Sequence, residues 1–140
     1  MRISLYRKGH FNAAHRLFVE SWSDEKNYEV FGKCANPHYH GHNYEMEVQV
    51  TGEVDPVTGM LIDLKLLKNL IRDKVENKLD HRNLNEEIPE FANLMPSVEN
   101  ICYVIWQLLR AHLDQRYALK VRLYETPRNF AEYPPDSTGM

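Results

Sequence analysis

The sequence contains no long apolar run, no apolar signal region and only two cysteines. No stretch approaches the roughly 20 consecutive apolar residues that a membrane-spanning helix requires. The first eight residues alternate like a β-strand, which is not the pattern of a secretory signal peptide. We therefore expect a cytoplasmic protein with no membrane partner. In that compartment Cys34 and Cys102 stay reduced, and a disulfide between them is not expected.

The chain also lacks a positive net charge, an internal repeat and a Gly/Ser-rich linker. Its formal net charge is -3, so the charge balance does not indicate a nucleic-acid partner. A length of 140 residues with 43% hydrophobic residues fits one globular domain with one real core. We expect a single domain over residues 1–140, with a loose tail at 134–140.

Alternating apolar residues predict the strands. Residues 42–52 give the clearest pattern, because Tyr44, Met46, Val48 and Val50 fall on one face. Strands are also predicted at residues 3–15 and 117–126, with a final short one near Phe130. The turn over residues 55–59 predicts a hairpin whose second strand is short, at residues 60–62.

Helical spacing of apolar residues predicts two long helices. One covers residues 64–79, with Asp63 as its N-cap, and Leu64, Leu67, Ile71, Val75 and Leu79 on one face. The second begins after Ser97, and a short helix is expected at residues 24–31. This order predicts an α+β fold in which an antiparallel four-stranded sheet carries two helices on one face.

Histidine is the unusual residue, with seven in the chain and most of them before residue 43. In His40-Gly41-His42 the two imidazoles lie two residues apart, so an extended backbone points both toward one metal ion. His15 ends the first predicted strand on the parity of its apolar residues and is the natural third ligand. Three imidazoles with one open position are typical of a catalytic zinc site. The alternative is a set of hydrogen-bonded core histidines; His10, His38 and His112 remain unassigned.

The residues around this motif leave alternatives open. Cys34 is either a fourth ligand, which makes a closed structural site, or a thiolate base beside the metal. Glu125 continues the core parity of the strand before it and then needs a partner, unless that strand has already ended.

Two further acidic positions have simple explanations. Asp80 and His81 follow the first long helix; neighbouring side chains do not easily hydrogen-bond to each other, and a solvated helix end explains the pair. Glu99 suits the dipole of the second helix.

The sequence closely resembles the 6-pyruvoyl-tetrahydropterin synthase family. The run from Phe31 to Tyr44 carries most of the resemblance, which extends over residues 10 to 133. The other matching runs are Ala13–Leu17, Gly52–Pro56, Leu79–Leu84, Val98–Asn100 and Tyr124–Thr126. The resemblance implies the tunnelling fold, in which subunits close their sheets into a barrel, and a homohexamer made of two trimers.

The resemblance also implies roles for the candidate residues. His15, His40 and His42 bind one zinc ion per subunit, and Cys34 acts as a base. Asp80 and His81 supply the second half of the proton relay from a neighbouring subunit. Glu125 anchors the pterin ring, with Glu99 assisting. Lys33 and Arg16 are candidate phosphate contacts.

The implied reaction is a zinc-dependent lyase reaction. It converts 7,8-dihydroneopterin triphosphate to 6-pyruvoyl-tetrahydropterin with release of triphosphate. A related branch, the 6-carboxytetrahydropterin synthases of queuosine biosynthesis, uses the same substrate and also releases acetaldehyde. The spacing between Cys34 and His40 favours the first branch. Ser97 and Val98 depart from the paired threonines of many animal relatives, which puts one hydroxyl contact to the pterin in doubt.

Two alternative functions outside the pterin synthase class are a zinc hydrolase and a non-catalytic zinc-binding module. A hydrolase usually has a carboxylate base near the metal, and the His-x-His motif contains no Glu. A module would use Cys34 as a closed fourth ligand.

Overall fold

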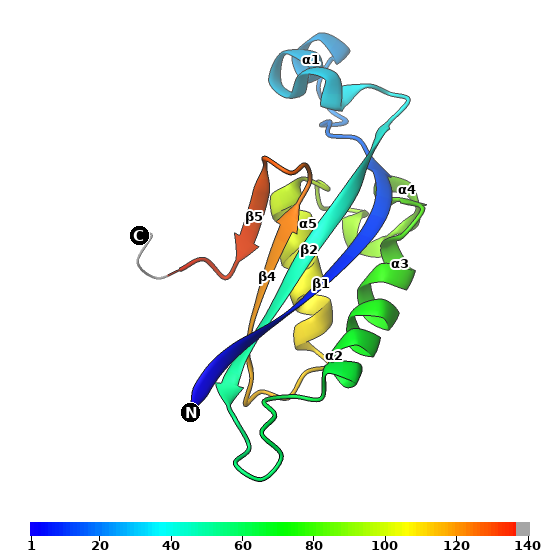
Figure 1. Ribbon diagram of the computed structural model, residues 1–140. Coiled ribbons are helices and arrows are strands. Elements are labelled where there is room, and N and C mark those ends of the chain that lie inside the picture. Colours follow the sequence, from blue (N-terminus) through cyan, green and yellow to red (C-terminus); the bar gives the residue numbers. More distant parts are fainter. Residues whose placement is uncertain (137–140) are drawn as a thin grey trace.

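The computed structural model describes residues 1–136 and contains one five-stranded sheet with its long helices on one face (Figure 1). The predicted loose tail lies partly outside the described residues, at 137–140. The strand order is β3-β1-β2-β4-β5. The strands are β1 Arg2–His15, β2 His40–Glu53, β3 Arg82–Asn83, β4 Ala118–Tyr124 and β5 Phe130–Tyr133.

Two helical segments cover the apolar face of the sheet. The first runs through α2 (Leu64–Ile71), a π-helical turn (Arg72–Glu76) and α3 (Asn77–Leu79). The second is α5, Val98–Arg110. Helix α1 (Asp24–Phe31) lies beyond the ends of β1 and β2 in Figure 1, and the shorter elements are two 3₁₀ turns at Gly32–Ala35 and Pro89–Phe91 and helix α4 at Leu84–Glu87.

Both predicted N-caps of the long helices are confirmed. The side chain of Asp63 accepts a hydrogen bond from the Lys65 N–H at 2.9 Å. The Ser97 hydroxyl accepts one from the Asn100 N–H at 3.3 Å. These bonds satisfy backbone donors that the first turn of a helix leaves without partners. Leu64, however, is 52% exposed, so it does not share the buried face on which it was predicted.

The pairing of β1 with β2 confirms the predicted core face. In the antiparallel register Phe11 pairs with Tyr44 and Ala13 pairs with His42. Phe11, Tyr44 and Ala13 are at most 1% exposed. Because side chains alternate across a strand, every second residue of each strand meets the helices.

The predicted four-stranded antiparallel sheet is wrong in two respects. The sheet has five strands, and the short β3 pairs parallel to β1 at Ala13 and Ala14. The hairpin strand predicted at residues 60–62 does not form. Strand β2 lies between β1 and β4, which occupy both of its edges. Beyond the end of β2, residues 55–60 instead close a turn in which the Asp55 N–H donates to the Met60 carbonyl at 2.9 Å, and the Leu61 carbonyl accepts from the Tyr117 hydroxyl at 3.0 Å.

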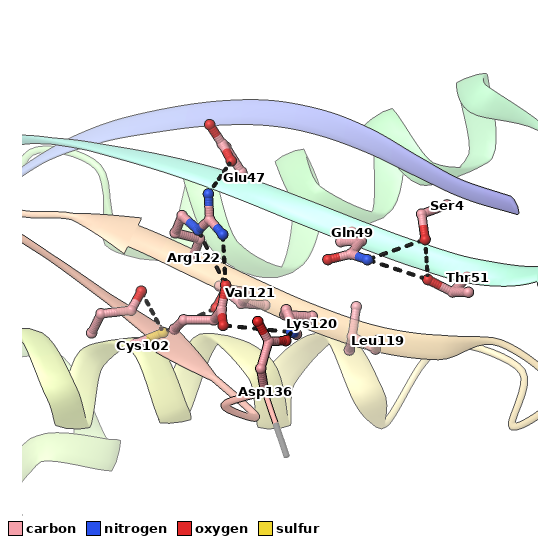
Figure 2. Close-up of polar contacts among 12 residues, drawn as sticks. Ser4, Glu47, Gln49, Thr51, Cys102, Leu119, Lys120, Val121, Arg122 and Asp136 are labelled. Carbon is pink, nitrogen blue, oxygen red and sulfur yellow. Dashed lines mark hydrogen bonds and ion pairs between the residues drawn. The ribbon is translucent and has the colours of Figure 1, made fainter. Parts of the chain in front are cut away.

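The helix-free face of the sheet carries polar side chains from neighbouring strands (Figure 2). The hydroxyls of Ser4 and Thr51 lie 2.7 Å apart, and Gln49 donates to Ser4 at 3.1 Å. Arg122 of β4 forms an ion pair with Glu47 of β2 at 3.6 Å. Only one face of the sheet is thus apolar, which matches a single layer of helices.

No helix in the described part of the chain has the length and apolar character needed to cross a membrane.

Candidate metal centre

The end of β1 and the start of β2 bring three histidines together. His15 pairs with His40 in the sheet register, and His42 follows two residues later on the same face. One ring nitrogen from each of the three lies within 4.8 Å of the others. His15 is fully buried, and His40 and His42 are half-buried. The sequence prediction that these three imidazoles converge is confirmed.

The cluster presents ring nitrogens without hydrogen-bond partners. They are His15 Nε2, His42 Nε2 and both nitrogens of His40, all buried from solvent. The other nitrogen of His15, Nδ1, lies 2.7 Å from the carbonyl oxygen of Pro96. A carbonyl can only accept, so Nδ1 carries the proton and Nε2 offers its lone pair to the centre of the cluster.

Burial favours the neutral form of His15 and His40, which is the form that binds metal ions. Burial lowers the pKa of His15 to about 4, against an opposing effect of the Pro96 carbonyl; the neighbouring His40 and His42 lower it further. Burial also lowers the pKa of His40. Three imidazoles with partner-free nitrogens suit a zinc ion with one open coordination position. The residues present therefore fit a metal centre.

Glu125 lies beside this cluster. It follows β4 directly, and its Oε1 atom is 3.9 Å from His42 Nε2. Its side chain is 22% exposed. The strand ends at Tyr124, yet Glu125 still faces the side of the sheet that carries the core, as its parity predicted.

Cys34 lies near the cluster but outside the group of three ligands. It belongs to the 3₁₀ turn at Gly32–Ala35 and is half-buried. The Leu17 N–H donates to the Cys34 carbonyl at 2.8 Å and ties this turn to the chain just after β1. Burial raises the pKa of the thiol, and the carboxylate of Glu125 raises it further. Its absence from the group favours a role other than fourth ligand.

Asp80 and His81 contact each other directly, contrary to the expectation from sequence. Asp80 Oδ2 lies 2.9 Å from His81 Nδ1. His81 adopts a left-handed backbone conformation with φ of 59°. This conformation turns the chain after α3, so the two neighbouring side chains meet.

Strand β1 holds the Asp80–His81 pair through Asn12. The Asn12 N–H donates to Asp80 Oδ1 at 2.8 Å, and its carbonyl accepts from the His81 N–H at 2.6 Å. The hydrogen bond from Asn12 is the largest cause of the lowered pKa of Asp80. The His81 side chain is 83% exposed. Neither residue belongs to the histidine group of the described chain.

The remaining candidates lie at the surface or hold neighbouring backbone. Glu99 is exposed in the first turn of α5. Lys33 is exposed as well. Arg16 donates from Nε to the Ala35 carbonyl at 2.9 Å, and its guanidinium lies 3.9 Å from the centre of the Phe18 ring. The three unassigned histidines, His10, His38 and His112, are exposed.

Sequence reasoning missed two groups around His15. Tyr44 was predicted only as a core residue; its hydroxyl is 3.5 Å from His15 Nδ1, and its ring packs on Phe11 with centroids 4.9 Å apart. A polar hydroxyl on the core parity, two residues after His42, was the available signal. Pro96 acts through its backbone carbonyl, which a sequence pattern does not reveal.

Two cavities of the described chain have linings that do not include the three histidines. One, of about 520 Å³, is at the opposite end of the sheet, between Arg2, Asp63 and Arg116. The other, of about 630 Å³, lies against β1 and β2, and its lining includes Asn43, Tyr124 and Thr126. Asn43 follows His42 in the chain, and Tyr124 and Thr126 flank Glu125. The second cavity is therefore lined by residues next in sequence to two residues of the candidate site.

The fold and this site define a class: an α+β protein built on one sheet, with a three-histidine centre suited to a metal ion. The family model described as 6-pyruvoyl tetrahydropterin synthase matches residues 4–136. The chain belongs to the 6-pyruvoyl tetrahydropterin synthase family.

Individual relatives agree with this membership. The Pongo abelii protein named 6-pyruvoyl tetrahydrobiopterin synthase is 43% identical over 127 residues, which cover 91% of this chain and 88% of the relative. The Homo sapiens protein of the same name is 42% identical with the same coverage. The solved structure of Caenorhabditis elegans 6-pyruvoyl tetrahydropterin synthase superposes with a TM-score of 0.90 and 37% identity, over 97% of each chain. These relatives support an enzyme of the pterin synthase type.

Proposed function

We propose that the protein is a zinc-dependent lyase that converts 7,8-dihydroneopterin triphosphate to 6-pyruvoyl-tetrahydropterin and releases triphosphate. The observation that carries the proposal is the cluster of His15, His40 and His42, whose free ring nitrogens face one another beside Glu125. The names of the relatives supply the class of product, a 6-pyruvoyl pterin.

His15, His40 and His42 would hold one zinc ion and leave a position open for the substrate side chain. A zinc ion bound there would supply Lewis-acid chemistry to the oxygens of the substrate side chain. The burial of His15 and His40 supports this role, because it lowers the pKa of both and favours the neutral form that binds a metal ion.

Cys34 would accept a proton from the substrate side chain at its Sγ atom. In the chain alone, burial and the Glu125 carboxylate raise its pKa and favour the thiol. Positive charge beside a cysteine favours the thiolate, which is the basic form. A base role for Cys34 therefore depends on the cation that the histidines would hold.

Asp80 and His81 would move a second proton in a neighbouring subunit's site. Their direct contact supports the assignment, because the Asp80 carboxylate orients the imidazole. The exposed His81 ring is available to a second subunit. A homohexamer made of two trimers, with sheets joined edge to edge into a barrel, would also pair the strand edges that one subunit leaves open.

Glu125 would anchor the pterin through its carboxylate, which can accept paired N–H bonds from an aminopyrimidinone ring. Its half-buried position beside His42 supports this role, because a ring bound there would lie next to the proposed metal ligands. Glu99 would assist from the first turn of α5, where its side chain is exposed.

Product analysis tests the proposal. The purified protein, loaded with zinc, is incubated with 7,8-dihydroneopterin triphosphate, and the products are identified by mass spectrometry. A 6-pyruvoyl product with free triphosphate supports the proposal. A 6-carboxy product with acetaldehyde shows that the protein belongs to the queuosine branch. Unchanged substrate, with zinc bound at one ion per chain, contradicts a lyase function.

A further inference from the structure

His15 differs from the other two histidines of the cluster in its outer hydrogen bond. Its Nδ1 donates to the Pro96 carbonyl at 2.7 Å, in a fully buried position. Neither ring nitrogen of His40 has a hydrogen-bond partner in the described chain. Of these two rings, only that of His15 is fixed in one tautomer and one orientation by a neighbouring protein group.

The two residues that flank Pro96 are held by the first turn of α5. Asn100 bonds to both residues that flank Pro96. Its side-chain Nδ2 donates to the Met95 carbonyl at 2.9 Å, and its backbone N–H donates to the Ser97 hydroxyl at 3.3 Å. The Ser97 N–H also donates to the Met95 carbonyl at 2.9 Å. The carbonyl that orients His15 therefore lies in a short loop clamped by one side chain.

We propose that Asn100 is a positioning residue that sets the metal affinity of the site through the Pro96 carbonyl and His15. The inference rests on the proposed metal-binding role of the three histidines. Without the amide of Asn100, the Met95 carbonyl loses one of its two donors, and the loop that carries Pro96 is free to shift. His15 Nδ1 then loses its fixed acceptor, and its Nε2 no longer points to the cluster in a single orientation.

Two variants remove the clamp in different ways. Asn100→Ala deletes the side chain. Asn100→Asp keeps its size but has no N–H to donate, and an acidic residue in the first turn of a helix suits the helix dipole. The Asp variant therefore carries the test if the Ala variant folds poorly. Loss of outer hydrogen bonds to metal ligands typically costs 10–100-fold in affinity, and we expect about tenfold weaker zinc binding for each variant.

Trp106→Phe is the matched control on the same helix. It removes another hydrogen bond from an α5 side chain to a backbone carbonyl, the one from Trp106 Nε1 to Leu119 at 2.9 Å. That bond ties α5 to β4 and has no link to His15. We expect this variant to be less stable but to bind zinc as tightly as the wild type.

Zinc affinity is measured by competition with a chromophoric chelator, and the His15 tautomer by ¹⁵N NMR of the metal-free protein. Weaker binding in both Asn100 variants, a mixed His15 tautomer and unchanged binding in Trp106→Phe support the inference. Wild-type affinity in both Asn100 variants overturns it and leaves the proposed function standing. A wild-type chain that binds no zinc overturns the metal role of the histidines as well. Equal weakening in Trp106→Phe also overturns the inference, because it reduces the effect to general stability.

Discussion

The carboxylate of Glu125 and the imidazole of His42 lie 3.9 Å apart, although they come from opposite ends of the chain. Each side chain is about one-fifth exposed. Strand β4 pairs with β2 from Thr51 to Glu45, so the end of β4 lies near the start of β2, where the candidate metal-binding motif lies. A candidate ring anchor and a candidate metal ligand therefore occupy one half-buried site within a single chain.

Replacement of this carboxylate tests its role as the pterin anchor. We expect Glu125→Gln to keep its zinc and its fold, because the change is isosteric. Loss of a charge-assisted hydrogen bond of about 1.5–3 kcal/mol lowers kcat/KM by about 10–100-fold. Steady-state kinetics and zinc analysis measure both quantities. Glu99→Gln, in an exposed position, is expected to have a smaller effect; a larger effect at Glu99 would contradict the assignment.

Replacement of each cysteine tests whether Cys34 is a base or a structural metal ligand. We expect Cys34→Ala to keep one zinc ion per chain and to lose about 10²–10⁴-fold in kcat, as removal of a general base does. Cys102→Ala is the control, because Cys102 is buried in α5 and donates to the Val121 carbonyl at 3.4 Å, away from the cluster (Figure 2). It should lower stability and spare zinc binding. If Cys34→Ala loses its metal, Cys34 is a ligand and the site is a closed structural one.

Replacement of His40 tests its role as a metal ligand, and replacement of the nearby surface residue His38 is the comparison. We expect His40→Ala to abolish stoichiometric zinc binding, because two imidazoles remain for the ion. Zinc should then no longer raise the melting temperature of the variant, whereas ligand binding to the folded state raises that of the wild type. His38→Ala is the control, since His38 is exposed two residues earlier. Metal analysis and thermal melting in the presence and absence of EDTA give the readouts; a His40→Ala protein with full zinc content would refute the assignment.

A mixing experiment tests whether Asp80 and His81 act in a neighbouring subunit. Cys34→Ala and His81→Ala should each be nearly inactive alone. If each site combines Cys34 of one subunit with His81 of another, mixed oligomers contain some sites with both residues intact, and activity returns. Subunits are exchanged by partial denaturation and refolding. Homo-oligomers of each variant, treated in the same way, are the control. Mixed oligomers that stay inactive would place both residues in the same subunit's site.

The buried thiol of Cys102 predicts a loss of stability at alkaline pH. Burial raises the pKa of this thiol from 9.0 to about 12 in the folded chain. The unfolded chain releases this proton at lower pH than the folded chain, so the free energy of unfolding falls as pH rises from 9 to 12. The full effect of three pKa units is about 4 kcal/mol.

Urea unfolding at several pH values measures this slope. Cys102→Ala should remove most of it, and Cys34→Ala should leave it in place. Burial also raises the pKa of Tyr44, so a residual alkaline slope is expected in both variants. Equal slopes in the wild type and Cys102→Ala would contradict the prediction.

The structural features that follow from a regular period or from local chemistry were predicted correctly from the sequence. The buried faces of β1 and β2 follow from the apolar residues at every second position, because one face of the sheet is apolar and the other is exposed to solvent. These residues include Phe11, Ala13, Tyr44 and Met46. The N-caps Asp63 and Ser97 follow from local chemistry. The convergence of His15 with the His40-Gly41-His42 motif follows from the same alternation, once β1 and β2 are neighbours.

Features that depend on which edges and backbone groups are free were not predicted. The turn at residues 55–59 predicted a hairpin with a short second strand, but the Leu61 carbonyl in that segment accepts a hydrogen bond from the Tyr117 hydroxyl instead of pairing with β2. The two-residue strand β3 has too few residues to show a period. The contact between Asp80 and His81 depends on the left-handed conformation of His81, which the hydrogen bonds of Asn12 hold in place.

The sequence by itself determined which side chains face the core, and therefore which three histidines converge. Side-chain alternation is a local property of an extended backbone, so it can be read along the chain. Only the tertiary structure decided what surrounds these histidines: the Pro96 carbonyl on His15, Glu125 beside His42 and the Asn12 backbone under Asp80. These contacts join segments far apart in the chain, and those of Pro96 and Asn12 use backbone groups that every residue carries, so no local pattern of side chains specifies them.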